Sequence, residues 1–502
     1  MYERVFVFEV SGPTLELFLE RIDHLPNFRR LFEQGAQSRL RTPLQPVAPA
    51  AFGTLLTGKN PGKTGLFDFF KFPAGGYRRI PFSTSILPEE PFYQLLSSRG
   101  IRVGILNVPL TYPLPRVNGF VVSGDEGIQG DFAWPPEVAK ALNADGYSVP
   151  FGASYASGRE VAFARRAFDM IAMRRRALLT LFGDGRWQFG MLTIHAVGEL
   201  LHAFWRFYDT RHPAYSSLSR HQGLGDPFLQ AFEAMDQLLG DVIDLTGPRG
   251  LVLVLGAWSH RLEHSRVHFN AFLEDAGYLR FKRTLGTQVK RVAFRSGISA
   301  ASAERLAHSL NVYRLFHYRL GRGKRSAVTS AAFLSYHDVD WARTRAVAMG
   351  YLGQIYLNVR GHRPQGVIPP ADYARERERL RELLMQLRDP RSGKPVVERV
   401  VTRDDIYSGA ELTNAPDLLI HLQDGYSGDS GFTGAGRLLT DAPANHSSDH
   451  WDQSFLLAGG EGIRPGNVEA RLEDIAPTVV HALGQEVPSD YDGHVLPIFG
   501  DP

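Results

Sequence analysis

Two short segments of the chain contain side chains of the types that bind metal ions. Glu199 and His202 are three residues apart in a stretch with helical periodicity, so both can face the same way. His446, Asp449 and His450 lie close together in a stretch rich in Ser and Asn. A mononuclear metal site would take His202 and His450 as ligands. Its third ligand would be Glu199, His446 or Asp449. In the alternative interpretation, the two histidines are polar residues that are hydrogen-bonded to their neighbours.

Other positions lie at predicted strand ends and turns, where an active site would form, but their residues lack the side chains of a catalytic site. The strand VFVFEV ends at Ser11, the turn VAPAAF contains Ala48, and the strand LVLVLG runs into Ala257 and Trp258. Gly198 follows a further predicted strand, and open α/β sheets build their sites at the carboxyl ends of strands. Alanine and tryptophan side chains are not metal ligands, and alanine has no hydroxyl to act as a nucleophile. These positions therefore predict a crevice without the usual catalytic groups.

Predicted strands and helices alternate along the chain, and these elements must position the residues above. Residues 251–256 form a short, wholly apolar run, which is typical of a strand buried on both faces. Strands alternating with helices indicate an α/β fold with a doubly wound, mainly parallel sheet and helices on both faces. The predicted strands cover 4–10, 101–108, 119–124, 189–195, 251–256, 350–359, 416–422 and 454–460. The predicted helices cover 25–35, 50–57, 199–209, 228–246 and 373–388, with a last helix in LEDIAPTVVHALG.

The pattern changes between residues 259 and 345. This stretch contains the charged helical sequence SAERLAHSLNVYRLFHYRL and a loop rich in Gly, Lys and Arg. We interpret residues 259–345 as a helical insertion or cap. The core domain is then expected to comprise residues 1–258 and 346–502.

Several segments, in their order along the chain, resemble the alkaline phosphatase superfamily in its type I phosphodiesterase/nucleotide pyrophosphatase branch, which includes predicted phosphohydrolases and phosphomutases. The resemblance covers nearly the whole chain. The matching segments are LPNFRRLFEQGA, LLTGKNPGKTGLFDFF, GILNVPLTYPLPRVNGFVVSG, HAFWRFYD, GYLGQIYLNVRGHRPQGV, APDLLIHLQDGY, GIRPG, LEDIAPTVVHALG and DGHVL.

The resemblance implies a reaction centre in which two metal ions, usually zinc, flank the reacting phosphorus, and a Ser or Thr hydroxyl is the nucleophile. Among the positions that it implies, only His202 and His450 keep a metal-binding side chain, and both belong to the same metal site. The implied aspartates fall on Ser11, Gly198 and Ala257, the implied nucleophile on Ala48, and the implied histidines on His202, Trp258 and His450.

We therefore predict a pseudoenzyme, with the fold of this family and a degenerate active site. Such a protein would need no catalytic residue and no cofactor. It would bind a phosphorylated or glycan-like small molecule, or a protein partner. The alternative is a phosphodiesterase or phosphohydrolase with a single divalent metal, such as zinc, at His202 and His450. In that case activated water would take the place of the missing nucleophile at Ala48.

The amino-acid composition argues against several classes of protein. The chain has 502 residues, 56 Lys and Arg against 53 Asp and Glu, and a net charge of +3, which does not favour a nucleic-acid binder. It has no cysteine, so disulfides and cysteine-based metal sites are excluded. No apolar run has the roughly 20 residues that a membrane span needs. The N-terminus does not resemble a signal peptide. We expect a cytoplasmic protein.

Overall fold

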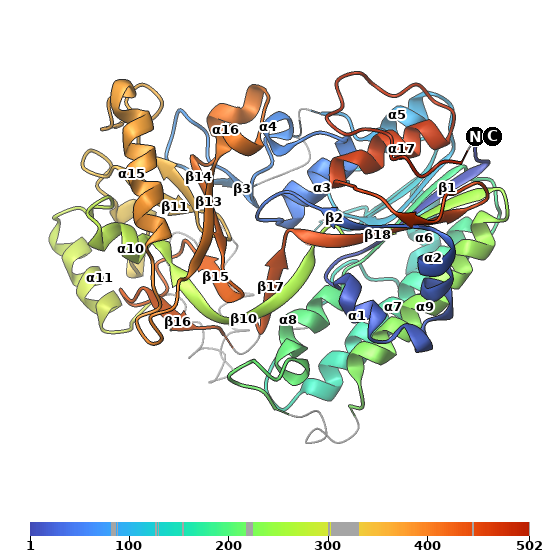
Figure 1. The fold of residues 1–502 in the computed structure, drawn as a ribbon, viewed down its shortest axis with the longest axis horizontal. Helices are drawn as coiled ribbons and strands as arrows, with labels where there is room; N and C mark the ends of the chain where they lie inside the picture. Colours follow the sequence, from blue (N-terminus) through green and yellow to red (C-terminus); the bar gives the residue numbers. More distant parts are fainter. Residues whose placement is uncertain are drawn as a thin grey trace.

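The structure is a computed structural model. Figure 1 shows two lobes side by side, with both chain termini on the larger lobe and one long curved strand running between the two. The structure describes residues 1–81, 87, 89–125, 128, 130–152, 155–216, 224–299, 302, 331–443 and 446–500.

The larger lobe is built on a nine-stranded sheet. Its middle strands, β9, β1, β8, β5 and β6, are mutually parallel. Each residue of β9, β8 and β5 is buried, as expected of apolar strands covered on both faces. The sheet order is β19 (Gly466–Asn467), β2 (Ala36–Arg41), β18 (Gln453–Gly460), β9 (Gly250–Leu255), β1 (Arg4–Val10), β8 (Phe189–Ile194), β5 (Val103–Val108), β6 (Gly119–Ser123) and β7 (Ala133–Trp134).

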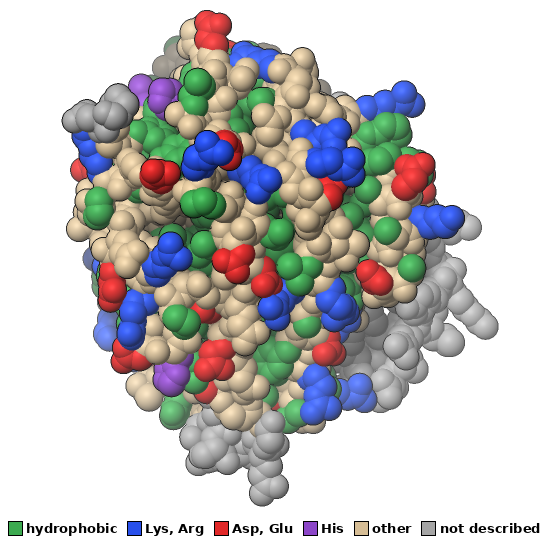
Figure 2. All heavy atoms as spheres, turned by 90° about the vertical axis from the view of Figure 1, so that its right-hand side faces the viewer, with side chains coloured by type: hydrophobic (Ala, Val, Ile, Leu, Met, Phe, Trp, Pro, Cys, Tyr) green, Lys and Arg blue, Asp and Glu red, His purple; other side chains and the backbone are tan. Residues whose placement is uncertain are grey.

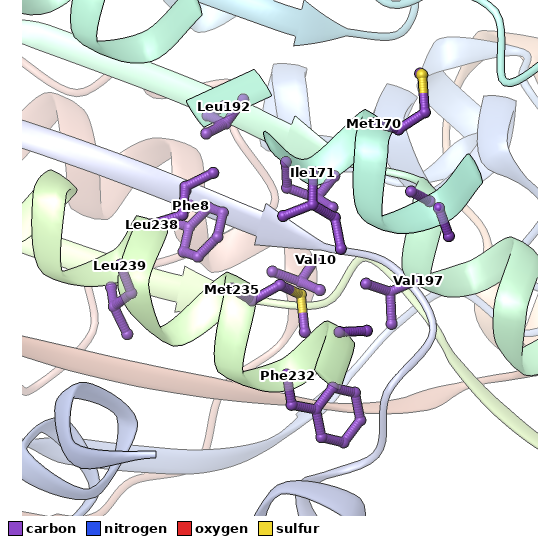
Figure 3. Close-up of a cluster of buried hydrophobic side chains, with 14 of the residues drawn as sticks. Phe8, Val10, Met170, Ile171, Leu192, Val197, Phe232, Met235, Leu238 and Leu239 are labelled. Atoms are coloured by element: carbon purple, nitrogen blue, oxygen red, sulfur yellow. The ribbon is translucent and has the colours of Figure 1, made fainter. Parts of the chain in front are cut away.

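Helices cover both faces of this sheet. Successive side chains of a strand point to opposite faces, so Phe8 packs into one hydrophobic cluster and Val7 into the other. Figure 3 shows Phe8 and Val10 of β1 beside Phe232 and Met235 of α9. The first face carries α1 (Leu15–Leu19), α2 (Pro26–Gln34), α6 (Pro136–Ala144), α7 (Glu160–Phe182), α8 (Ala196–Tyr208) and α9 (Pro227–Thr246). The second carries α3 (Ala48–Thr57), α5 (Phe92–Ser98) and α17 (Ile475–Ala482).

This arrangement confirms the predicted fold class, a doubly wound, mainly parallel sheet with helices on both faces. Most predicted strands and helices of this lobe lie within a few residues of their observed bounds. The long helix α7 is an exception, because the sequence analysis assigned no element to residues 160–182.

The smaller lobe contains two further sheets. An antiparallel sheet has the order β11 (Ala346–Met349), β12 (Gln354–Leu357), β14 (Leu418–Leu422) and β13 (Val397–Thr402). The second is centred on β10 (Ser259–His268), the long strand between the lobes, which pairs with β15 (Gly425–Asp429), β16 (Leu439–Asp441) and β17 (Ser448–Trp451). The remaining elements include α4 (Pro61–Thr64), β3 (Phe70–Lys71), β4 (Ile80–Pro81), α10 (Phe269–Asp275), α11 (Leu285–Arg295), α15 (Tyr373–Met385) and α16 (Arg403–Ile406).

The chain leaves the nine-stranded sheet after β9 and next contributes a strand to it at β18. The core domain was expected to resume after residue 345, but the next strand of the nine-stranded sheet is β18, which begins at Gln453. The stretch from residue 259 begins with a ten-residue strand, β10, where helices were expected. The helix expected in SAERLAHSLNVYRLFHYRL lies, apart from residue 302, outside the described residues.

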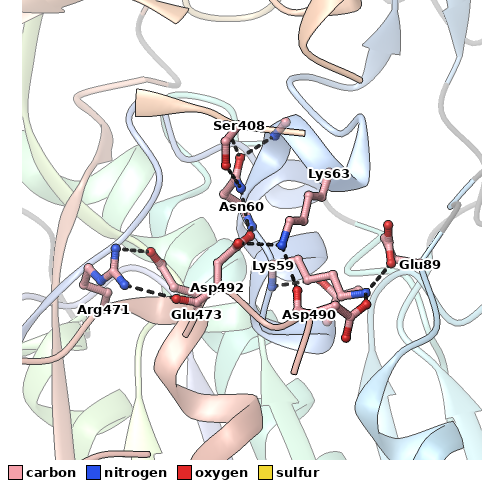
Figure 4. A network of polar contacts seen from close by, with 11 residues as sticks. Lys59, Asn60, Lys63, Glu89, Ser408, Arg471, Glu473, Asp490 and Asp492 are labelled. Carbon is pink, nitrogen blue, oxygen red and sulfur yellow. Dashed lines mark hydrogen bonds and ion pairs between the residues drawn. The ribbon is translucent and has the colours of Figure 1, made fainter. Parts of the chain in front are cut away.

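Ion pairs connect the C-terminal segment to the larger lobe. Lys59, in the turn between α3 and α4, contacts the carboxylates of Glu89 and Asp490, and Lys63 lies 2.6 Å from Asp492 (Figure 4).

Figure 2 shows basic and acidic side chains interspersed over the face it presents. Within the part of the chain that the structure describes, every helix is too short or too polar to cross a bilayer.

Candidate metal centre

Three histidines from three elements meet between the lobes. His202 comes from α8, His260 from β10 and His450 from β17, and one nitrogen of each lies within 4.8 Å of the others. The His202 ring centroid is 4.1 Å from that of His260 and 5.2 Å from that of His450. The antiparallel pairing of β10 with β17 places His260 directly opposite His450. We call these three residues the histidine cluster.

Ser448 determines the orientation of two of these rings. His202 Nδ1 donates to the Ser448 carbonyl oxygen at 2.8 Å, and His260 Nδ1 lies 2.9 Å from the Ser448 hydroxyl. That hydroxyl donates its only hydrogen to the Leu201 carbonyl oxygen at 2.8 Å, so it accepts from His260 Nδ1. Both rings therefore keep a lone pair on Nε2, which makes no hydrogen bond to the described residues. A hydrogen bond from the far nitrogen is the usual way in which a protein orients a metal-binding histidine.

The third ring of the cluster belongs to His450. Its Nδ1 is buried and has no hydrogen-bond partner among the described residues. Burial lowers the pKa of all three histidines, and proximity to His202 lowers the pKa of His260 and His450 further. Neutral imidazoles with free lone pairs fit a single divalent cation.

Gly198 borders the histidine cluster. A Cβ at residue 198 would lie 3.9 Å from His260 Nε2, which is an ordinary contact, and 3.3 Å from the Ser11 carbonyl oxygen.

Ser11, Ala257 and Trp258, on which the resemblance places the second metal site, are buried. Ser11 Oγ donates to Glu9 Oε1 at 2.5 Å, and the backbone N–H of Ala257 donates to the same oxygen at 3.0 Å. The Trp258 ring lies 5.0 Å from that of His450 and 5.9 Å from that of Phe52, centroid to centroid.

Ala48 is the first residue of α3 and brings no polar atom in its side chain. Glu9 is the one carboxylate in this group. Its Oε1 accepts two hydrogen bonds, and its Oε2 is buried without a partner among the described residues. One carboxylate without the further ligands that alanine and tryptophan cannot supply does not fit a second metal ion.

The structure also places the candidate third ligands. Glu199 is exposed on α8, and Asp449 accepts a 2.8 Å hydrogen bond from the His450 backbone N–H. The His446 ring lies 4.9 Å from that of His202, but the group of mutually close nitrogens found among the described residues is His202, His260 and His450.

The sequence analysis missed His260, because it assigned residues 259–345 to a helical insertion. The available signal was its position, two residues after Trp258 at the end of a buried strand.

A hollow of about 730 Å³ opens beside the histidine cluster. It lies between α1, the end of α8 and the strands of the smaller lobe. Its walls combine aromatic rings with charged side chains of both signs. They include Trp205, Tyr208, Arg211, His260, Asp424 and Trp451.

Comparisons with known proteins agree with this architecture. Residues 5–450 match the family model for type I phosphodiesterase/nucleotide pyrophosphatase. A search of curated proteins finds no match. Among solved structures, a multiply substituted variant of the alkaline phosphatase PafA is 13% identical with a TM-score of 0.57, and the alignment covers 99% of each chain. The phosphonoacetate hydrolase of Sinorhizobium meliloti 1021, in complex with phosphonoformate, is 12% identical with a TM-score of 0.55 over 96% of each chain. At these identities the solved structures establish a shared fold.

Proposed function

The chain belongs to the type I phosphodiesterase/nucleotide pyrophosphatase family, and from this premise we propose that it hydrolyses phosphoric esters with one divalent cation, such as zinc, at His202, His260 and His450. One observation carries the proposal: three histidine rings meet, two of them are oriented by hydrogen bonds from Nδ1 to Ser448, and His260 Nε2 and His450 Nδ1 are buried without a hydrogen-bond partner among the described residues. Three protein ligands with an open position are typical of catalytic zinc.

The proposed chemistry differs from that of a two-metal enzyme. A divalent cation bound at the cluster would supply Lewis acidity to a phosphoryl oxygen and to water. Because Ala48 has no hydroxyl, the chain cannot form a covalent phosphoenzyme at that position. The new bond to phosphorus would then come from water, and the ester oxygen would leave as an alcohol. The hollow beside His260 offers space for the remainder of the ester.

A second candidate function is binding without catalysis, as in a pseudoenzyme. Its support is the Trp258 ring, which packs against Phe52 and His450 at a position where the resemblance implies a metal ligand. In that case the crevice would hold a phosphorylated or glycan-like small molecule, or the protein would act through a protein partner.

Metal content and turnover, measured together, separate the two functions. The purified chain, its His260→Ala variant and its His264→Ala variant would be loaded with zinc, and bound metal would be measured by mass spectrometry. Hydrolysis of bis(4-nitrophenyl) phosphate and 4-nitrophenyl phosphate would be followed in the same samples. His264 is the matched control, because it lies on the same strand and bonds to Ser265 rather than to the cluster.

We expect about one zinc ion per chain and measurable turnover in the wild type and in His264→Ala, with both lost in His260→Ala. Bound metal without turnover of either ester would favour the binding function. Absence of bound metal in the wild type would contradict the proposal.

A further inference from the structure

The helix α11 turns an apolar face toward solvent at the outer edge of the smaller lobe (Figure 1). Its side chains Leu285, Val289 and Val292 are 82%, 61% and 67% exposed, and Ile298, just beyond the helix, is 56% exposed. Apart from Met1, these four are the most exposed large hydrophobic side chains among the described residues. Single hydrophobic residues are normal on a protein surface, whereas several on one short segment mark an interaction site.

Three of these residues form a continuous stripe along the helix. Leu285, Val289 and Val292 are four and three residues apart, which places them on one side of α11. The residues on the opposite side, Thr287 and Phe294, are buried. A surface helix normally directs its apolar stripe into the core. In α11 the stripe faces outward, and we call Leu285, Val289 and Val292 the outward stripe.

Positive charge accompanies the outward stripe. Residues 276–299 contain six Arg and Lys and no Asp or Glu, in a chain whose net charge is only +3. Three of the six pair with acidic side chains next to the helix. The other three, Arg280, Lys282 and Arg283, are exposed, and none of them forms an ion pair within the described part of the chain. They come directly before α11, so their charge lies at the N-terminal end of the outward stripe.

An anionic lipid bilayer presents the two chemistries that this surface requires. Its phosphate head groups attract Lys and Arg, and the hydrocarbon just below them accepts aliphatic side chains. Nucleic acid would engage the cations but would leave the aliphatic side chains in water. We propose that α11 docks the protein onto an anionic bilayer, with the outward stripe in the acyl boundary and Arg280, Lys282 and Arg283 at the phosphates.

The docking surface is separate from the histidine cluster. The cluster is built by α8, β10 and β17, and the outward stripe contributes no residue to it. Docking would determine where the protein acts, and it does not depend on the proposed hydrolysis. The contact would be peripheral, because every described helix is too short or too polar to cross a bilayer.

Co-sedimentation with vesicles tests the docking. The full chain would be mixed with vesicles of phosphatidylcholine alone, or of phosphatidylcholine and phosphatidylglycerol in equal parts. The stripe variant, Leu285→Ser/Val289→Ser/Val292→Ser, removes the apolar contact. Its matched control removes three exposed apolar side chains from other helices and is Leu179→Ser/Met385→Ser/Ile406→Ser.

We expect the wild type to partition onto the anionic vesicles at least about tenfold more strongly than onto the neutral ones. The stripe variant should lose this partitioning by at least about tenfold, because burial in hydrocarbon supplies much of the affinity. Lys282→Gln/Arg283→Gln should lose about tenfold on the anionic vesicles and should bind the neutral ones as the wild type does. The matched control should stay within about twofold of the wild type.

A fluorescent label locates the contact. The chain has no cysteine, so a single introduced cysteine carries the only label. A polarity-sensitive fluorophore on Val289→Cys should shift to shorter wavelength when anionic vesicles are added. The same fluorophore on Leu179→Cys, on α7 of the larger lobe, should not respond. Equal responses at the two positions would refute docking through α11.

Other coverings of the outward stripe give different results. If a second copy of the chain covers it, sedimentation would show a dimer that dissociates in the stripe variant. If another segment of the same chain covers it, the stripe variant would have a lower thermal unfolding temperature than the wild type. Either result, in a wild type that does not bind anionic vesicles, would overturn the proposal, as would the absence of vesicle binding by itself.

Discussion

At the scale of single residues, one serine orients two of the three rings of the histidine cluster. Ser448 accepts hydrogen bonds from two imidazoles, through its carbonyl oxygen for His202 and its hydroxyl for His260. Because both bonds use Nδ1, both Nε2 lone pairs stay available. Ser448 and His450 lie two residues apart on β17, so the same strand supplies a ligand and the residue that orients the other two.

A second residue-scale feature is the buried carboxyl of Glu9. Burial raises its pKa to about 7 from 4.5, although hydrogen bonds from Ser11 and Ala257 oppose the shift. The folded protein therefore binds more protons than the unfolded chain between these values. The free energy of unfolding should accordingly fall as the pH rises through this window.

The substitution Glu9→Gln removes the pH dependence of the free energy of unfolding that this carboxyl causes. We expect the variant to match or approach wild-type stability near pH 4.5 and to exceed it above pH 7 by about 3 kcal/mol at most. Urea unfolding at about pH 5 and about pH 8 would measure the difference. The exposed Glu33→Gln serves as the matched control for removing a carboxylate. A Glu9→Gln effect that is equal at both pH values would contradict this account.

At the scale of elements, buried parallel strands were the most predictable part of the fold. The strand β9 is a wholly apolar run, and its sequence indicates two-sided burial. The strand β10, SHRLEHSRVH, lacks that signature because it lies between the lobes and carries polar side chains. Local sequence therefore located the scaffold of the larger lobe but not the strand that contributes His260.

The turn between α3 and α4 permits a prediction at this scale. The Lys59 side chain is 7% exposed and pairs with Glu89 and Asp490, whose side chains are 24% and 63% exposed. Because the partners are partly solvated, we expect Lys59→Met to lower the free energy of unfolding by about 1–2 kcal/mol. Asp490→Asn should cost less, about 0.5 kcal/mol. Urea denaturation measures both, and a larger loss in Asp490→Asn would refute this ranking.

At the scale of the whole molecule, the cluster joins the two lobes. His202 belongs to α8 on the nine-stranded sheet, whereas His260 and His450 lie on strands of the sheet centred on β10. A cation that binds the folded chain alone stabilises it by about 3 kcal/mol at a hundredfold excess over its Kd. The stabilisation should therefore affect unfolding of both lobes.

We expect added zinc to raise the thermal unfolding temperature of the wild type and of His264→Ala, and a chelator to reverse the increase. His260→Ala should show no zinc-dependent increase, because it lacks one ligand. Differential scanning calorimetry would follow both lobes at once. An equal response of His260→Ala to zinc would locate the stabilising ion elsewhere.

The sequence alone determined the family resemblance, the doubly wound sheet and the residue types at Ser11, Ala48, Ala257 and Trp258. Residue identity limits what these positions can do, because alanine and tryptophan side chains offer no suitable lone pair to a cation in any fold. Only the tertiary structure decided which residue joins His202 and His450. His260 reaches them through the pairing of β10 with β17, and Ser448 then sets the ring tautomers. Contacts between strands nearly two hundred residues apart in the chain leave no trace in local periodicity, which reports only the burial of each segment.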